Sequence, residues 1–269
     1  MKDLQGGVAL VTGGASGIGF GIARALLSSG MRVVIADIRE DHMARAMAEL
    51  RDEPCHFLQL DVADRFAWCR AAEEVARLCG KLHVLCNNAG IGVLKDLRTS
   101  TREDWDWLMS VNLRGVIHGV TAMLPLIRAH QEGGHIMATS SMGGLIVGES
   151  GGIYSAGKFG VVAYMECLRE DLAPENIGVS VLCPAAVNTN IFDHASMRPG
   201  RAAGAATSEP DGLDPEIAKR LLAQGRSPLE VGEMVREAIL RNDPYIFTDR
   251  RVEGDVSARR DALLAAAPA

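Results

Sequence analysis

Short, almost continuously apolar runs alternate with longer amphipathic stretches along most of the chain. An apolar run of four to eight residues that is rich in β-branched side chains is typical of a strand covered on both faces. The runs that fit this description are GVALVTGG (7–14), MRVVIAD (31–37), HFLQLDV (56–62), HVLCNNAG (83–90), GHIMATSS (134–141), GVSVLCP (178–184) and YIFT (245–248).

The stretches between these runs have the 3.6-residue periodicity of helices that bury one face. They cover residues 17–29, 41–51, 64–79, 102–130, 152–173 and 228–241. Strands that alternate with helices predict an α/β fold, in which a doubly wound parallel sheet of about seven strands has right-handed crossovers and helices on both faces. We find no linker or repeat, so residues 1–269 are expected to form a single domain.

Three segments depart from this regular alternation. Gly115, Gly119 and Pro125 predict a break or bend within 102–130, because each weakens an uninterrupted helix. Residues 188–227 are rich in Ala, Gly and Pro, and a segment of this length predicts a functional lid after the sixth strand. The tail at about 250–269, which ends in DALLAAAPA, is either a helix end on a neighbouring subunit or a frayed terminus.

Composition narrows the class of partner. Hydrophobic residues make up 48% of the 269 residues, and 28 Lys and Arg against 34 Asp and Glu give a net charge of −6. This balance argues against nucleic acid or an anionic membrane as the partner and favours a small molecule. The six cysteines lack metal-site spacing, so no metal is expected, and the chain shows neither a signal-peptide core nor a run of about 18 apolar residues. We therefore expect a cytoplasmic protein.

The glycine-rich sequence VTGGASGIGFG joins the first strand to the first helix. Gly13, Gly14, Gly17 and Gly19 therefore lie at the carboxyl edge of the sheet, where doubly wound folds bind ligands. Glycines there allow a tight turn and a close approach of backbone N–H groups to a pyrophosphate, whose charge the helix dipole favours.

Acidic and amide side chains end the next strands at the same edge. Asp37 lies 18 positions beyond Gly19, near the interval at which a carboxylate binds the adenosine ribose, which favours NAD over NADP. Arg39 is the caution, because it could pair with a 2′-phosphate or simply begin a solvated helix. Asp61 and Val62 suit the adenine amine and face, and Asn88 suits the ribose or neighbouring backbone.

Tyr154 and Lys158 are spaced i, i+4 and so project from one face of a helix. Ser141 ends the fifth strand, and Asn112 lies in the preceding helical segment. A phenol is a poor base near neutral pH, but a lysine ammonium and an oxidised nicotinamide nearby lower its pKa. Tyr154 could then remove a hydroxyl proton while hydride leaves the same carbon, with Ser141 bound to the substrate oxygen and Lys158 to the nicotinamide ribose.

The motifs TGxxxGIG (12–19), NNAG (87–90) and YxxxK (154–158), with Asn112 and Ser141, resemble the short-chain dehydrogenase/reductase family over roughly residues 5–250. The resemblance implies a Rossmann-like fold, a catalytic tetrad of Ser141, Tyr154, Lys158 and Asn112 in which the Asn holds a relay water, and a homotetramer or dimer. The cofactor contacts that it implies are Gly13, Ser16, Gly17, Ile18, Gly19, Asp37, Ile38, Asp61, Val62, Asn88, Tyr154, Lys158, Val187 and Thr189.

Two positions are ambiguous within this resemblance. Ala185 stands where the family has glycine after the sixth strand, which questions the turn there, since alanine resists positive φ. It does not question the contacts of the Val187 backbone and Thr189 with the nicotinamide carboxamide. Ser140 adjoins Ser141, and the interval to the tyrosine selects Ser141.

The residues expected to enclose the substrate are mostly apolar. They are Met142, Leu145, Ile146, Val147, Ile191, Phe192 and Met197. A hydrophobic secondary alcohol or its ketone fits such walls. Strings such as ADIREDH, RPGR and EVGEMV are similar to bacterial Cα-dehydrogenases of lignin aryl ethers, which implies a benzylic alcohol. Steroid or alicyclic alcohols, an epimerase or dehydratase of the extended branch, and a non-catalytic NAD-binding redox sensor are the alternatives.

Overall fold

The computed structural model describes residues 3–93, 95–148, 151–192, 222–250 and 252–268, together with Ile217 and Arg220. Most of the predicted lid, with Met197, lies outside the described residues. The segments 188–192 and 222–227, at its two ends, are described.

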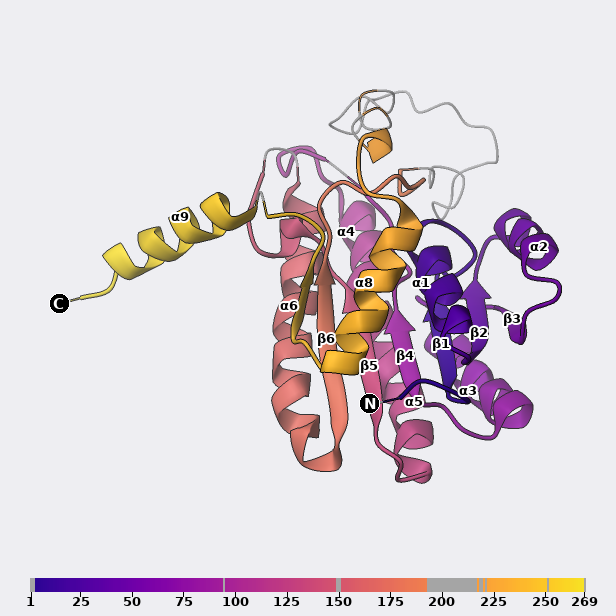
Figure 1. Cartoon of the computed structure of the whole chain (residues 1–269). Coiled ribbons are helices and arrows are strands. Elements are labelled where there is room, and N and C mark those ends of the chain that lie inside the picture. The colour runs from indigo at the N-terminus through magenta and orange to yellow at the C-terminus, as the bar shows by residue number, and fades with distance from the viewer. Residues whose placement is uncertain are drawn as a thin grey trace.

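Seven parallel strands form one sheet in the order β3-β2-β1-β4-β5-β6-β7 (Figure 1). They are β1 (Val8–Thr12), β2 (Arg32–Asp37), β3 (Cys55–Gln59), β4 (Val84–Asn87), β5 (Gly134–Thr139), β6 (Ile177–Cys183) and β7 (Tyr245–Phe247). Every residue of β1, β4 and β5 is buried, as continuous apolar runs require. The predicted doubly wound parallel sheet is confirmed.

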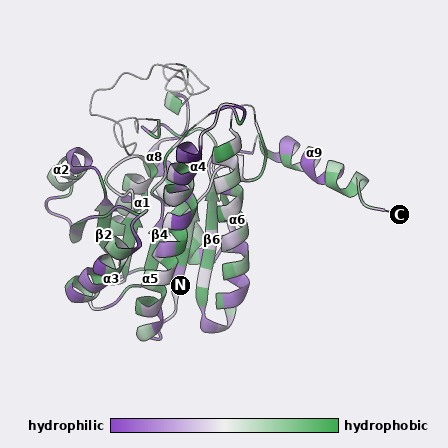
Figure 2. Ribbon diagram, turned by 180° about the vertical axis from the view of Figure 1, so that it is seen from behind, coloured by the Kyte–Doolittle hydropathy of each residue, from purple (hydrophilic) through white to green (hydrophobic). Residues whose placement is uncertain are grey.

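Helices cover both faces of the sheet (Figures 1 and 2). They are α1 (Gly17–Ser28), α2 (Glu40–Glu49), α3 (Arg65–Cys79), α4 (Arg102–Met109), α5 (Gly115–Ala129), α6 (Gly152–Leu172), α8 (Pro228–Arg241) and α9 (Val252–Ala265). Alternate residues of β1 divide between two cores, because side chains of a strand point to opposite faces. Ala9 and Val11 pack with α1, α2 and α8, whereas Val8 and Leu10 pack with α3, α5 and α6.

Glycines bring the backbones of α1 and α8 into direct contact. A Cβ atom on Gly21 would lie 1.9 Å from the carbonyl oxygen of Pro228, and one on Gly232 would lie 2.1 Å from the carbonyl oxygen of Gly21. Both separations are far below van der Waals contact. Side chains at either position would push α1 and α8 apart.

The predicted break in residues 102–130 is wrong in place and kind. Helix continues from α4 through a π-helical turn, η1 (Ser110–Arg114), into α5, and Pro125 lies inside α5. Thr121, whose carbonyl loses its partner at Pro125, is exposed to water. Gly119 instead permits close packing, because a Cβ there would lie 2.2 Å from Asn87 Oδ1 and 2.8 Å from Trp68 Cη2.

Among the described residues, one helical stretch, Arg102–Ala129, is long and apolar enough to cross a membrane by length and composition alone. Leu108, Met123 and Ile127 within it are buried in the protein interior, as in the core helix of a globular domain.

The C-terminal segment forms α9, so the tail is helical. This helix extends away from the body of the molecule (Figures 1 and 2). Leu263 and Leu264 are 61% and 65% exposed, and the Arg259 guanidinium lies 4.8 Å from the centre of the Phe159 ring in α6.

Candidate active site

The loop from β1 to α1 has a backbone that only glycine adopts readily. Gly13 and Gly17 have φ of 59° and 51°, in the left-handed region. A Cβ on Gly19 would lie 2.1 Å from the Gly13 carbonyl oxygen and 2.5 Å from Asn88 Nδ2. Ser16 is the N-cap of α1 and makes no side-chain cap hydrogen bond. Glycines therefore frame the N-terminus of α1, where a Cβ on Gly17 would lie 3.2 Å from Thr189 Cγ2.

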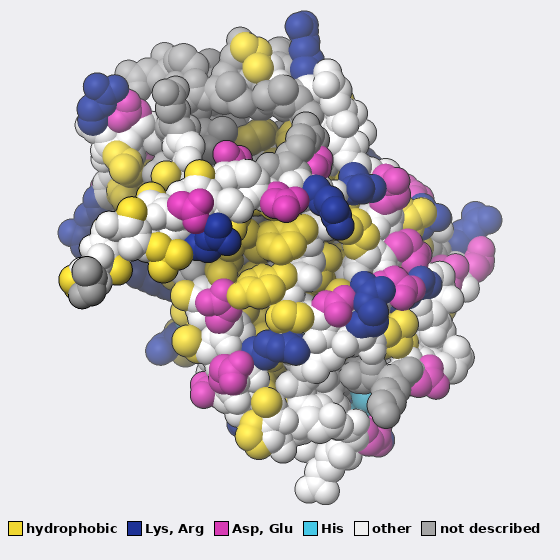
Figure 3. All heavy atoms as spheres, turned by 60° about the vertical axis from the view of Figure 1, so that its left-hand side comes forward, with side chains coloured by type: hydrophobic (Ala, Val, Ile, Leu, Met, Phe, Trp, Pro, Cys, Tyr) yellow, Lys and Arg dark blue, Asp and Glu magenta, His cyan; other side chains and the backbone are white. Residues whose placement is uncertain are grey.

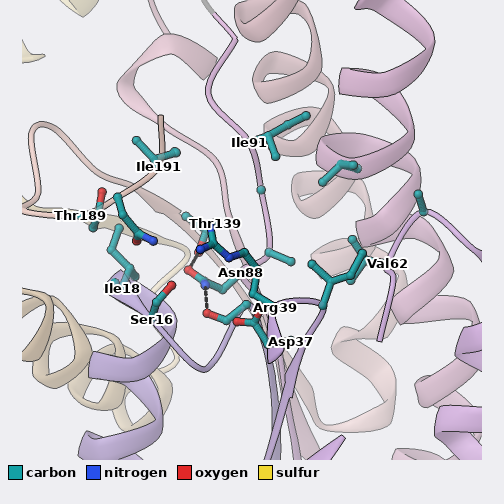
Figure 4. Close-up of a pocket in the computed structure, with 18 of the residues that line it drawn as sticks. Ser16, Ile18, Asp37, Arg39, Val62, Asn88, Ile91, Thr139, Thr189 and Ile191 are labelled. Carbon is teal, nitrogen blue, oxygen red and sulfur yellow. Dashed lines mark hydrogen bonds between the residues drawn. The ribbon is translucent and has the colours of Figure 1, made fainter. Parts of the chain in front are cut away.

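A threonine and an asparagine tie this loop to the neighbouring strand. Thr12 Oγ1 accepts the backbone N–H groups of Asn88 and Ala89, at 3.0 and 3.1 Å. Asn88 Nδ2 donates to the carbonyl oxygens of Thr12 and Gly13, and its Oδ1 accepts the Thr139 hydroxyl at 3.0 Å (Figure 4). Asn88 thus joins the ends of β1, β4 and β5, consistent with the backbone role among its two predicted roles.

A cavity of about 280 Å³ lies along this edge of the sheet (Figure 4). Twelve of the predicted cofactor-contacting residues line it: Gly13, Ser16, Gly17, Ile18, Asp37, Ile38, Asp61, Val62, Asn88, Tyr154, Lys158 and Thr189. Gly19 packs beneath the loop instead, and Val187 lines an adjoining cavity. The first cavity extends from the end of β2 to the start of α6.

Asp37 lies at the far end of this cavity and is 7% exposed. Its Oδ2 accepts the Ala15 N–H at 3.1 Å, and its Oδ1 accepts the Arg39 N–H at 3.0 Å. Each oxygen keeps a further lone pair for a ligand hydroxyl. The Arg39 side chain is held by Asp41, with Nε and Nη2 at 2.9 and 2.7 Å from its two oxygens, which keeps the pKa of Asp41 far below its usual value. The two predicted roles of Arg39, pairing with a 2′-phosphate and beginning a solvated helix, are therefore not exclusive. The side chain lines the cavity and is also paired with Asp41.

Tyr154 and Lys158 lie on one face of α6, with Lys158 Nζ 5.6 Å from the centre of the Tyr154 ring. Lys158 is 2% exposed, and its Nζ donates to the Thr139 carbonyl oxygen at 2.9 Å. Burial lowers the pKa of Lys158 to about 8. Burial also raises the pKa of Tyr154, and the hydrogen bond from Ser141 opposes this only in part. In the protein alone, desolvation of the phenolate sets the direction of the shift. The expected lowering also needs an oxidised nicotinamide beside the ring, so it stays a prediction for the cofactor complex.

The two serines at the end of β5 differ in what their hydroxyls bind. Ser140 is 1% exposed, and its hydroxyl donates to the Lys158 carbonyl oxygen at 2.8 Å. Ser141 Oγ accepts the Gly143 N–H at 3.1 Å and lines a cavity with Tyr154. Ser141 therefore keeps its hydroxyl proton for Tyr154 or a ligand, whereas Ser140 packs the back of α6.

Asn112 is fully buried in the π-helical turn η1. Its Oδ1 accepts the Ile91 N–H and its Nδ2 donates to the Ile91 carbonyl oxygen, both at 2.9 Å. A Cβ on Gly90 would lie 3.2 Å from Asn112 Oδ1 and 3.4 Å from Lys158 Nζ. Gly90 thus lies between the two side chains and leaves room around both.

A second cavity, of about 470 Å³, adjoins the first, and Tyr154, Ile18, Pro184, Thr189 and Ile191 line both. The only other polar side chain among its described lining residues is that of Ser141. The apolar part of the lining consists of Ile18, Met142, Pro184, Ala185, Ala186, Val187, Ile191, Phe192 and Leu222.

The residues predicted to enclose the substrate divide between the second cavity and other places in the fold. Met142, Ile191 and Phe192 line the second cavity, whereas Leu145, Ile146 and Val147 do not. Leu145 packs against the main core and Val147 is 75% exposed, because the chain turns away after the short 3₁₀ helix η2 (Met142–Gly144). Ala185 causes no strain, since among described residues other than glycine only Gln131, Asn176 and Asn242 have positive φ.

Several contributors to the site were not singled out from the sequence. Thr139 accepts Lys158 through its carbonyl and binds Asn88 through its hydroxyl. Its place as the last residue of an apolar strand, directly before Ser140, is a signal that could have identified it. Thr248 binds the loop after β6, at Ala185, but lies 63 residues away in sequence, and no local pattern marks it.

One potential metal-ligand cluster, His83, His130 and Glu132, occurs among the described residues, with ligand atoms within 4.8 Å of one another. Hydrogen bonds already use most of the ring nitrogens. His83 Nδ1 accepts the Val8 N–H, His130 Nδ1 accepts the Glu132 N–H, and His130 Nε2 donates to the Leu82 carbonyl oxygen. Only His83 Nε2 remains, and it faces Glu132 at 3.0 Å. This set is a hydrogen-bonded network and a poor metal site.

Comparison with known proteins agrees with this geometry. The family described as short chain dehydrogenase matches residues 7–199. The C alpha-dehydrogenase of Sphingobium sp. strain SYK-6 is 35% identical over 98% of this chain and 87% of its own, and the cyclopentanol dehydrogenase of Comamonas sp. strain NCIMB 9872 is 32% identical over 85% and 87%. A crystal structure of a short chain dehydrogenase/reductase from Burkholderia phymatum in complex with NAD superposes with a TM-score of 0.92 at 33% identity, covering 100% of this chain and 98% of that one.

Proposed function

The chain belongs to the short-chain dehydrogenase family, and on that premise we propose that it is an NAD-dependent dehydrogenase of a hydrophobic secondary alcohol, preferably one with an aryl group on the carbinol carbon. Its reaction class, an alcohol oxidised to its ketone by hydride transfer, is that of its relatives. One observation carries the proposal: Tyr154 lines both the cavity that suits a dinucleotide and the apolar cavity that holds Ser141.

The first cavity has the features that a dinucleotide needs. The N-terminus of α1 faces it across glycines, which favours a pyrophosphate, and the Asp37 oxygens suit ribose hydroxyls. The Asp37 carboxylate would repel a 2′-phosphate, which supports NAD as the preferred cofactor. Bound NAD supplies the hydride acceptor.

Oxidation removes a hydride from the carbinol carbon and a proton from its hydroxyl, leaving a carbonyl. Tyr154 would accept that proton, while the Ser141 hydroxyl, already accepting from Gly143, would donate to the substrate oxygen. Lys158 Nζ is fixed by Thr139 and keeps two N–H groups, one for the nicotinamide ribose and one toward the space at Gly90 beside Asn112. Asn112 would hold a water there as the relay to solvent.

Substituting Tyr154→Phe tests the catalytic assignment. The variant should lose at least about 100-fold in turnover, since the general base is gone, while NADH still binds, measured by fluorescence titration. Ser141→Ala should lose turnover without loss of NADH affinity. A Tyr154→Phe protein with normal turnover would refute the assignment. If the variant lost turnover and still performed the protein's function in the cell, the redox-sensor alternative would be favoured.

The second cavity supports an uncharged, hydrophobic substrate. Apart from Ser141, Tyr154 and Thr189 its described lining is apolar, and Phe192 is its one aromatic side chain besides Tyr154. The Phe192 ring packs against Gly92, where a Cβ would lie 3.0 Å from Phe192 Cε1, so Gly92 makes room for the ring at this position. Aromatic pairs contribute about 0.5–1.5 kcal/mol beyond area burial, which corresponds to a preference of about two- to tenfold for an aryl group.

The substrate assignment is tested with matched alcohols. We expect kcat/KM to be higher for 1-phenylethanol than for 1-cyclohexylethanol, and this ratio to fall in Phe192→Leu. Cyclopentanol and a hydroxysteroid complete the panel. Higher kcat/KM for either of these would support the alicyclic or steroid alternative and refute the aryl preference.

We also propose that the protein acts in the cytoplasm as a homo-oligomer, a tetramer or dimer. The edge strand β7 exposes Tyr245 and Phe247, whose rings stack with centroids 6.1 Å apart. Figure 3 shows hydrophobic side chains gathered on the face beside α9. A second copy would cover this face and the exposed leucines of α9. Multi-angle light scattering of the purified chain that gives the mass of one chain would refute this assembly.

A further inference from the structure

The loop that follows β6 lines the substrate cavity and carries Val187 and Thr189, the two residues assigned above to the nicotinamide carboxamide. Its sequence, PAAVNT, lacks the glycine expected at Ala185. Contacts from elsewhere in the chain determine where this loop lies. On its inner side the Pro184 carbonyl oxygen accepts the Met142 N–H at 3.1 Å.

On the outer side, Thr248 holds the loop. The Ala185 N–H donates to Thr248 Oγ1 at 2.9 Å, and Thr248, directly after β7, is 2% exposed. Thr248 lines neither of the two cavities. Any effect of its hydroxyl on a bound ligand therefore has to pass through the Ala185 backbone.

The chain that leaves the lid braces the same loop. The Arg226 N–H donates to the Ala186 carbonyl oxygen at 3.2 Å, and the Asn188 N–H donates to the Arg226 carbonyl oxygen at 3.0 Å. A Cβ on Gly225 would lie 2.3 Å from the Ala186 oxygen, so this close pairing needs a glycine. The Arg226 side chain in turn donates from Nε to the Thr248 carbonyl oxygen at 2.5 Å.

Thr248 is therefore the junction of both outer contacts: its hydroxyl oxygen accepts the Ala185 N–H of the loop, and its carbonyl oxygen accepts the side chain of Arg226, whose backbone pairs with the loop. We propose that Thr248 is a positioning residue, which sets the backbone of residues 185–189 and through it the placement of the nicotinamide half of the cofactor. This rests on the proposed function, because it requires NAD to bind with its carboxamide at Val187 and Thr189.

Two matched pairs of variants isolate the hydroxyl. Thr248→Val keeps the branched shape and loses the acceptor, which leaves the Ala185 N–H without its partner. Thr248→Ser and Thr248→Ala both lose the methyl group and differ only in the oxygen. We expect Thr248→Val to raise the Kd for NADH and the KM for NAD by about three- to tenfold, the equivalent of one hydrogen bond, and to lower kcat. Thr248→Ser should stay near the wild type, and Thr248→Ala should follow Thr248→Val.

Inhibition by ADP-ribose distinguishes a positioning role from a general loss of structure, because a general loss would weaken the binding of ADP-ribose and NADH alike. ADP-ribose carries the adenosine and pyrophosphate but no nicotinamide, so its inhibition constant should be unchanged in all three variants. An equal rise in the inhibition constant of ADP-ribose and in the Kd for NADH would overturn the proposal. An unchanged Kd for NADH in Thr248→Val would overturn it too. If Thr248→Val fails to fold, the Ser and Ala pair decides by the same criterion. A wild type that neither binds NADH nor oxidises any alcohol would refute the proposed function itself.

Discussion

Replacing Lys158 with methionine should make the protein more stable while it abolishes turnover. Lys158 is 2% exposed, and burial lowers its pKa from 10.5 to about 8. At neutral pH the fold therefore holds a charged ammonium in a place that disfavours charge. Methionine keeps a linear side chain of similar length without the charge. Lys158→Met therefore removes the unfavourable burial of an ammonium group and loses little packing.

The magnitude follows from the pKa shift. A lowering from 10.5 to about 8 corresponds to about 3 kcal/mol, at about 1.4 kcal/mol for each pKa unit. The substitution also removes the hydrogen bond from Nζ to the Thr139 carbonyl oxygen, which is worth about 1 kcal/mol. The net gain in the free energy of unfolding at pH 7 is about 2 kcal/mol, and it should raise Tm by about 5 °C for a chain of this size.

The pH dependence has a definite sign. Since the folded pKa lies below the unfolded one, the unfolded state binds more protons between about pH 8 and 10.5. Wild-type stability therefore rises relative to Lys158→Met across this window, and the penalty is present in full below pH 8. The advantage of the variant should shrink steadily from pH 8 upward.

Thermal and urea unfolding of the wild type and of Lys158→Met at pH 7.0, 8.5 and 9.5 measures the difference in their free energies of unfolding. Titrating groups that both proteins share cancel in this difference. Lys81→Met is the matched control, because Lys81 is about half exposed and pairs with Glu132 at the opposite end of the sheet. It should give no gain. A Lys158→Met protein that is less stable than the wild type at pH 7, or a Tm difference that does not narrow with pH, would show that burial of the charge is not destabilising.

Three further predictions concern the base, the cofactor and the helix contact. The raised pKa of Tyr154 predicts that alcohol oxidation at saturating NAD accelerates from pH 7 to 10 while ketone reduction slows, and a flat initial-rate profile would exclude a phenol base. Asp37→Asn should raise kcat/KM for NADP at least about tenfold and lower that for NAD, because one full charge is removed near the 2′-position; unchanged selectivity in steady-state kinetics would contradict it. Gly232→Ala should lower the free energy of unfolding in urea by about 3 kcal/mol or more, because its Cβ would meet the Gly21 carbonyl at 2.1 Å, and a wild-type midpoint would contradict the backbone contact.

The strands and most helix bounds could be predicted from local pattern, because burial on both faces gives the strands continuous apolar runs. The common location of the glycine loop and the ends of β2, β3 and β4 could also be predicted, because the carboxyl ends of parallel strands lie at one edge of the sheet. Asp37 and Asn88 are examples.

Features set by contacts between distant segments could not be predicted in this way. The irregularity at 110–114 accompanies the two hydrogen bonds of Asn112 with Ile91, whereas Gly115 and Gly119, which suggested a break, serve packing against Val62 and Trp68. The direction of the Tyr154 pKa shift depends on how deeply the phenol is buried, and sequence spacing does not contain that quantity.

The glycine contact between α1 and α8 has a consequence for biosynthesis. The helix that faces the first cavity, α1, ends at Ser28, and the helix whose backbone it touches, α8, begins only at Pro228. A ribosome releases α8 only after the long segment between the two helices has emerged, so α1 waits for its final packing until then. The final packing of α1 is thus a late, long-range step in folding.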